Sequence, residues 1–257
     1  MLRGKQWAAM PILMLAVIVG VEAQGGGKGK KATTPEEAVK FIEQAFKAGD
    51  AHAALDQMAE PSRTLHEFEL TNLLTDEALR KAFDDKFGKD PKFVAGPSVK
   101  ELLQALKGLR VHAKQDKGGG KVELKVWVTD EHKPGKTITI EHTWIALKQG
   151  DAWKLLVPVG GPSGKVATRK GPDGKDVEVE IGESGKDPDP KEIGYIKNSL
   201  PKFKDLMEKL ARQIKEGAYK TRPEADQAVR AALGAFRQAN PPPKLDTKEG
   251  KSEEKKK

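Results

Sequence analysis

Apolar residues recur every three or four positions in the first third of the chain, and this spacing predicts helices. The first helix opens with a capping box, in which Thr34 caps the helix, Pro35 takes the first helical position and Glu37 reaches back. The ranges that share helical periodicity, with cap or breaker residues at their ends, are 34–49, 50–61, 62–87 and 98–108. We expect the third helix to be interrupted at Thr75 and Asp76, because both residue types favour caps over helix interiors.

Apolar and polar residues alternate after residue 108, which is the pattern of half-buried strands. The expected strands, separated by Gly-rich or polar turns, cover residues 109–114, 121–128, 137–147 and 152–157. Short turns such as Gly150-Asp151 join them, so they are expected to pair as an antiparallel meander. The fold class is therefore α+β, with N-terminal helices packed on a curved four-stranded antiparallel sheet and a C-terminal helical hairpin after it.

The C-terminal third divides into three segments of different composition. Residues 159–190 are rich in Gly, Pro and Asp and are expected to be a linker with a small hairpin, which either docks on the main domain or stays mobile. Two amphipathic stripes in 191–240 predict the helical hairpin. The first of these helices is expected to restart at Pro201. Residues 241–257 have the Lys/Glu-rich composition of a disordered tail.

The first 23 residues have the pattern of a secretory signal peptide. Arg3 and Lys5 are followed by a 14-residue apolar run and by Val21-Glu22-Ala23, which fits a cleavage site. A membrane-spanning helix needs about 20 apolar residues, so cleavage is favoured over anchoring. We expect an exported bacterial protein, periplasmic or extracellular, without a transmembrane span after cleavage. Residues 24–32 would form a flexible Gly/Lys leader.

Composition removes several classes of function. The 257 residues include no cysteine, which excludes disulfides, thiolate metal sites and a cysteine nucleophile. Lys and Arg number 46 against 38 Asp and Glu, a net charge of +8, but the two signs are interspersed along the chain. Aromatic and basic residues do not interleave, so no specific nucleic-acid partner is expected. Long-range attraction to an envelope polyanion stays open.

The segment TPEEAVKFIEQAFKAGDAHAALDQMAEP (34–61) resembles the opening of a nuclear transport factor 2-like domain, a cystatin-like cone that ketosteroid isomerases share. The strands at 121–157 are similar to the last strands of that family. The resemblance implies a domain at 33–158, in which a curved sheet folds over helices around a cone-shaped pocket. The helical insert at 62–107 and the chain from 159 depart from the family pattern. The isomerases' pocket tyrosine is not carried over, because Tyr195 and Tyr219 lie outside this domain.

His142 is the residue with the clearest chemistry. It shares one face of its strand with Ile140 and Trp144, where an imidazole could act as a general base or contact a ligand. The alternative is a core histidine that is hydrogen-bonded to a neighbour. Trp144 and Trp153 flank one hairpin, and both lie on apolar rows. Together with His142 they form the candidate ligand-binding set. The alternative role of the two tryptophans is core packing. No metal or cofactor is expected.

These patterns predict a non-enzymatic exported protein that binds a small apolar ligand or a partner protein. Two alternatives stay open. One is a small hydrolase or lyase that uses His142 as its catalytic residue, and the other is an envelope-associated scaffold that binds polyanions. A cavity in which His142 meets a carboxylate within hydrogen-bonding reach would favour the enzyme.

Overall fold

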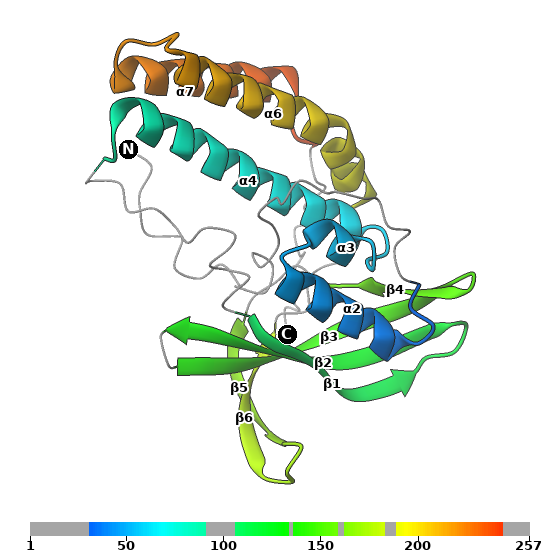
Figure 1. Ribbon diagram of the computed structural model, residues 1–257. Helices are drawn as coiled ribbons and strands as arrows, with labels where there is room; N and C mark the ends of the chain where they lie inside the picture. The colour runs from blue at the N-terminus through cyan, green and yellow to red at the C-terminus, as the bar shows by residue number, and fades with distance from the viewer. Residues whose placement is uncertain (1–30, 91–105, 134–135, 159–161, 183–188, 244–257) are drawn as a thin grey trace, which may run out of the picture.

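The structure, a computed structural model, describes residues 31–90, 106–133, 136–158, 162–182 and 189–243 (Figure 1). The expected signal peptide, nearly all of the leader and the tail from residue 244 lie outside the described residues. The described helices are α2 (Pro35–Ala48), α3 (Ala51–Leu55), α4 (Ser62–Phe87), α6 (Pro190–Glu216) and α7 (Arg222–Ala239). The strands are β1 (Leu106–Asp116), β2 (Lys121–Lys133), β3 (Lys136–Gln149), β4 (Ala152–Leu156), β5 (Pro162–Lys170) and β6 (Asp176–Gly182).

The α+β class is confirmed, but the expected four-stranded antiparallel sheet is wrong in detail. The six strands form one mixed sheet in the order β1-β2-β3-β6-β5, and β4 also pairs with β3. β3 is 14 residues long and β4 only 5, so the hairpin covers one end of β3 and leaves backbone groups unpaired at the other end. β6 fills that free edge in parallel orientation, which satisfies polar groups of the backbone that would otherwise lack partners.

Three helix boundaries differ from the sequence prediction. Leu106 belongs to β1, where it pairs with Asp130 and is buried, rather than to a helix ending at Gly108. α4 runs through Thr75 without interruption, because the Thr75 hydroxyl donates to the carbonyl oxygen of Thr71 at 2.8 Å instead of capping a new helix. α6 likewise continues through Pro201, which is exposed, because packed side chains on both sides stabilise the helix.

Two hydrophobic cores hold the molecule together. In the main core, α2 and α3 cover the inner face of the sheet, and the buried sheet residues there are Leu109, Leu124, Val126, Val128, Trp144, Ala146 and Leu155. The second core joins the C-terminal half of α4 to α6 and α7 and consists of Leu79, Ala82, Phe83, Met207, Leu210, Ala211, Ile214, Ala225 and Val229.

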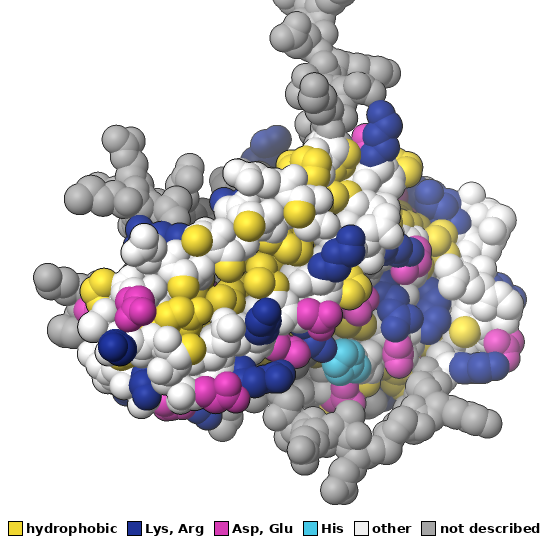
Figure 2. All heavy atoms as spheres, turned by 90° about the horizontal axis from the view of Figure 1, so that it is seen from above, with side chains coloured by type: hydrophobic (Ala, Val, Ile, Leu, Met, Phe, Trp, Pro, Cys, Tyr) yellow, Lys and Arg dark blue, Asp and Glu magenta, His cyan; other side chains and the backbone are white. Residues whose placement is uncertain are grey.

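The C-terminal helices are therefore part of a second helical layer, built around α4 and seen above the sheet in Figure 1. Seen from above, an apolar band crosses this layer between charged side chains (Figure 2). Among the described residues, no helix is both long and apolar enough to cross a membrane.

Candidate functional site

Strand register assigns each candidate residue to a face of the sheet. In the β2–β3 pair, Val126 lies opposite His142 and Leu124 lies opposite Trp144. Directly opposed residues share a face, and Leu124 and Val126 belong to the main core, so His142 and Trp144 point toward the helices. The alternating residues, including Glu141, point to the outer face.

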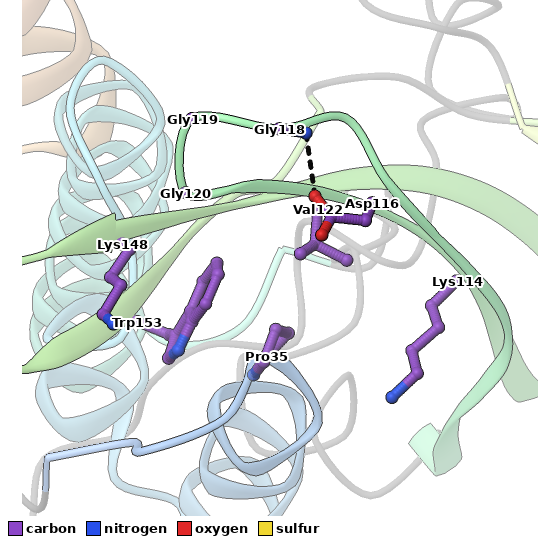
Figure 3. Close-up of a pocket in the computed structure, with 9 residues that line it drawn as sticks. All are labelled: Pro35, Lys114, Asp116, Gly118, Gly119, Gly120, Val122, Lys148 and Trp153. Atoms are coloured by element: carbon purple, nitrogen blue, oxygen red, sulfur yellow. Dashed lines mark hydrogen bonds between the residues drawn. The ribbon is translucent and has the colours of Figure 1, made fainter.

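A hollow of about 610 Å³ lies at the end of the sheet, where the β1–β2 turn approaches the start of α2 (Figure 3). Its lining comes from the start of α2, from the turn end of the β1–β2 hairpin and from the β3–β4 hairpin, and consists of Pro35, Lys114, Asp116, Gly118, Gly119, Gly120, Val122, Lys148 and Trp153. Of the three candidate ligand-binding residues, Trp153 lines this hollow, and His142 and Trp144 do not.

The glycine turn shapes this hollow. Gly118, Gly119 and Gly120 have φ values of 76°, 60° and 72°, a left-handed run that residues with a Cβ rarely adopt. The Asp116 carboxylate accepts the Gly118 N–H at 2.8 Å, as the dashed line in Figure 3 shows. This hydrogen bond uses one oxygen of Asp116 to hold the turn, and the carboxylate remains part of the lining of the hollow.

Trp153 and Lys148 stand side by side in the hollow (Figure 3). They are paired in the β3–β4 register, and Trp153 is half-buried and packs against the main core. The Trp153 backbone N–H donates to the carbonyl oxygen of Ala32 at 2.9 Å, so the chain before α2 fixes this end of β4.

The two lysines of the hollow differ in their partners. The Lys114 ammonium lies 2.5 Å from the Glu36 carboxylate. Lys148 forms no ion pair or side-chain hydrogen bond with the described residues, and its side chain is exposed. The site therefore combines an aromatic wall with one amine whose charge is not compensated by a described acid.

The structure separates Trp153 from His142 and Trp144. Both of the latter residues are 1% exposed, Trp144 within the main core, and neither lines the hollow. Among the described residues, the two ring nitrogens of His142 and Nε1 of Trp144 have no hydrogen-bond partner. Burial lowers the pKa of His142 to about 4, so its imidazole is neutral at neutral pH.

No carboxylate among the described residues lies within hydrogen-bonding reach of His142, so the geometry supplies no acid–base pair there. The neighbouring carboxylate, Glu141, is on the other face. It accepts from Trp127 Nε1 at 3.0 Å and from Arg169 Nε and Nη2 at 3.1 Å each. Burial acts to raise the pKa of Glu141, but the bonds from Arg169 and Trp127 lower it below its usual value.

This outer-face cluster of Glu141, Arg169, Trp127 and His112 is not evident from the sequence. A register shift between Val111 and Ala113 places His112 on the Trp127 ring, with centroids 4.2 Å apart and planes 14° from parallel. Alternation alone predicts only that His112 is exposed. The shift is a property of the paired strands, so no single-strand pattern reveals it.

Two other titratable groups with shifted pKa values, His66 and Glu69, lie on α4. His66 is buried, its Nε2 is 3.3 Å from the Val157 carbonyl oxygen, and burial lowers its pKa to about 4. Glu69 is half-buried, which raises its pKa to about 7, and its Oε2 has no hydrogen-bond partner within the described part of the chain. Among the described residues, no three potential metal ligands come together.

Comparison with known proteins adds no relative. No protein-family model matches the chain, and neither a curated protein nor a solved structure does.

Proposed function

We propose that this chain is an exported, non-catalytic binding module with a nuclear transport factor 2-like sheet, and that its ligand occupies the hollow at the end of that sheet. The observation that carries this proposal is the pairing of Trp153 with Lys148 in the hollow. An indole ring offers a large flat apolar surface, and an ammonium beside it attracts an acidic group.

The ligand class follows from that lining. Trp153, Pro35 and Val122 supply apolar surface, and Lys148 supplies a charge with no described acid near enough to pair with it. A small amphiphile with a flat apolar body and one carboxylate matches both features. The volume of about 610 Å³ falls within the range of small-molecule sites.

A matched pair of probes tests the two contacts separately. The carboxylate probe is 2-naphthoate, and the neutral probe of the same shape is 2-naphthalenemethanol. Binding is measured by saturation-transfer NMR and titration at low salt. Trp153→Ala is expected to abolish binding of both probes, because each stacks on the indole.

Lys148→Gln is expected to weaken 2-naphthoate binding by about two- to fivefold, the effect of one exposed charge pair, and to leave binding of the alcohol unchanged. Lys165→Gln, at an exposed lysine of β5 outside the hollow, is the charge-matched control. Equal binding of both probes by wild type and Trp153→Ala would remove the hollow as the site. Native mass spectrometry of protein purified from its own host then identifies the retained ligand.

A further inference from the structure

The β5–β6 hairpin is attached to the rest of the sheet by a short seam. It leaves the sheet beside β3 and extends below it (Figure 1). In the described part of the chain, β6 pairs with β3 only through Ile140–Glu180 and Glu141–Ile181. In contrast, β2 and β3 are paired along nearly their whole length. Such a short ladder contributes few of the hydrogen bonds that hold a strand in place, so other contacts must keep the hairpin against the sheet.

A side-chain clamp on the outer face supplies those contacts. Arg169 of β5 forms a bidentate pair with Glu141 of β3, and the same carboxylate accepts the Trp127 indole N–H. Glu141 is 6% exposed, and Val179 of β6 is fully buried. Charge-assisted bidentate bonds are among the stronger hydrogen bonds in proteins. Arg169 is therefore the residue that fastens the hairpin to the main sheet.

His142 lies directly at the seam, on the inner face. A Cβ built on Gly182 of β6 would lie 2.3 Å from Nδ1 and 2.8 Å from Cγ of His142, so the imidazole ring packs directly onto the Gly182 backbone. Neither ring nitrogen of His142 has a hydrogen-bond partner among the residues that the structure describes, although His142 is only 1% exposed. A buried polar group in this state is costly, and the cost disappears when the group reaches water or a ligand.

We propose that the β5–β6 hairpin is a gate that swings off β3 and exposes the imidazole of His142, with Arg169–Glu141 as the latch that keeps it shut. Opening breaks two strand pairings and the latch, and it gives both ring nitrogens of His142 hydrogen-bond partners. The exposed neutral imidazole offers one donor and one acceptor, which suits a small uncharged polar molecule. The gate is independent of the hollow that contains Trp153.

Histidine modification measures the opening directly. Diethyl pyrocarbonate acylates accessible neutral imidazoles, and mass spectrometry of proteolytic fragments gives the rate at each histidine in the full chain. His66 is the internal control, because it is also buried (6% exposed, against 1% for His142), its pKa is likewise lowered to about 4, and it lies on α4 rather than at the seam. His52, exposed on α3, reports the reagent's activity.

Three variants then separate gating from unfolding. Arg169→Gln breaks the latch, and Lys170→Gln, whose partner Asp176 is within the hairpin, is the matched control. Ile140→Cys with Glu180→Cys places a disulfide across the seam, where neighbouring strands are about 4.8 Å apart, within disulfide reach. The chain contains no other cysteine, so oxidation and reduction act at this pair alone.

We expect diethyl pyrocarbonate to modify His142 about tenfold faster in Arg169→Gln than in wild type, and at the wild-type rate in Lys170→Gln. The oxidised double variant should protect His142 about tenfold relative to its reduced form, and His66 should react at one slow rate throughout. Equal His142 rates in the oxidised and reduced forms would overturn the gate. A parallel rise at His66 would do the same, since it means that the whole protein opens. If Arg169→Gln does not fold, the oxidised and reduced comparison decides alone.

Discussion

Replacing His142 with leucine should stabilise the protein, although it changes a fully buried side chain. Leucine is close to histidine in volume and removes two ring nitrogens that have no hydrogen-bond partner in the described structure. An unsatisfied buried polar group costs about 1–3 kcal/mol. After some loss to imperfect packing, we expect His142→Leu to raise the free energy of unfolding by about 1 kcal/mol at pH 7.5.

Acidification should widen this difference. The pKa of His142 is about 4 in the folded protein and 6.5 in the unfolded chain, so between these values the unfolded state binds the extra proton. Wild-type stability therefore falls as the pH falls below about 6.5, and at pH 5 the loss from this residue is about 2 kcal/mol. The variant lacks the group, so its advantage should grow from about 1 to about 3 kcal/mol.

Urea unfolding followed by circular dichroism at pH 7.5 and pH 5 measures both quantities. Glu69, whose raised pKa gives the opposite dependence, is present in both proteins and cancels in the difference. The matched variant is His66→Leu. Its free energy of unfolding should also rise relative to wild type on acidification. At pH 7.5, however, it should be about 1 kcal/mol less stable than wild type, because the substitution removes the bond to the Val157 carbonyl.

His142→Ala separates the ring's polarity from its size, because it leaves a cavity and should lower the urea midpoint. A constant gap between His142→Leu and wild type at the two pH values would refute the argument, since the imidazole would then titrate normally. A His142→Leu protein less stable than wild type at pH 7.5 would show that the ring nitrogens have partners in solution.

Two further predictions concern the helices and the tail. Ile214→Ala, in the second core, should cost about 2–5 kcal/mol in urea unfolding, because Ile214 is fully buried between helices. Deleting residues 241–257 should leave the thermal midpoint unchanged, as expected for a tail of disordered composition, and a large drop would contradict that reading.

Local sequence signals predicted the elements whose stability is local. The Thr34 side chain accepts the Glu37 N–H at 3.1 Å, and Gly49 ends α2 in the left-handed conformation, as the capping pattern indicated. The β3–β4 hairpin at Gly150-Asp151 also follows its turn signal. Each of these features depends on residues only a few positions apart, so the chain needs no distant partner to specify it.

Features that depend on distant partners were not predictable in the same way. The parallel pairing of β6 with β3 joins residues 40 positions apart, Ile140 and Glu180. The sequence of β5 and β6 does not predict which strand β6 pairs with. Trp153 at the hollow was predicted as a candidate, and hairpin pairing explains why Lys148 stands beside it. Pro35 joins them only because α2 crosses this end of the sheet, and Lys114 joins them because β1 pairs with β2.

The consecutive residues Glu141 and His142 show how strand alternation divides chemistry between the two faces. Glu141 turns outward to Arg169 and Trp127, whose hydrogen bonds hold it in the charged form despite burial. His142 turns inward onto Gly182, has no hydrogen-bond partner among the described residues and is held neutral. The bond from Arg169 to Glu141 therefore adds to the strand pairings that favour docking of the hairpin, and the buried imidazole opposes it. Changing either residue should shift the free energy of docking in a direction set by the face.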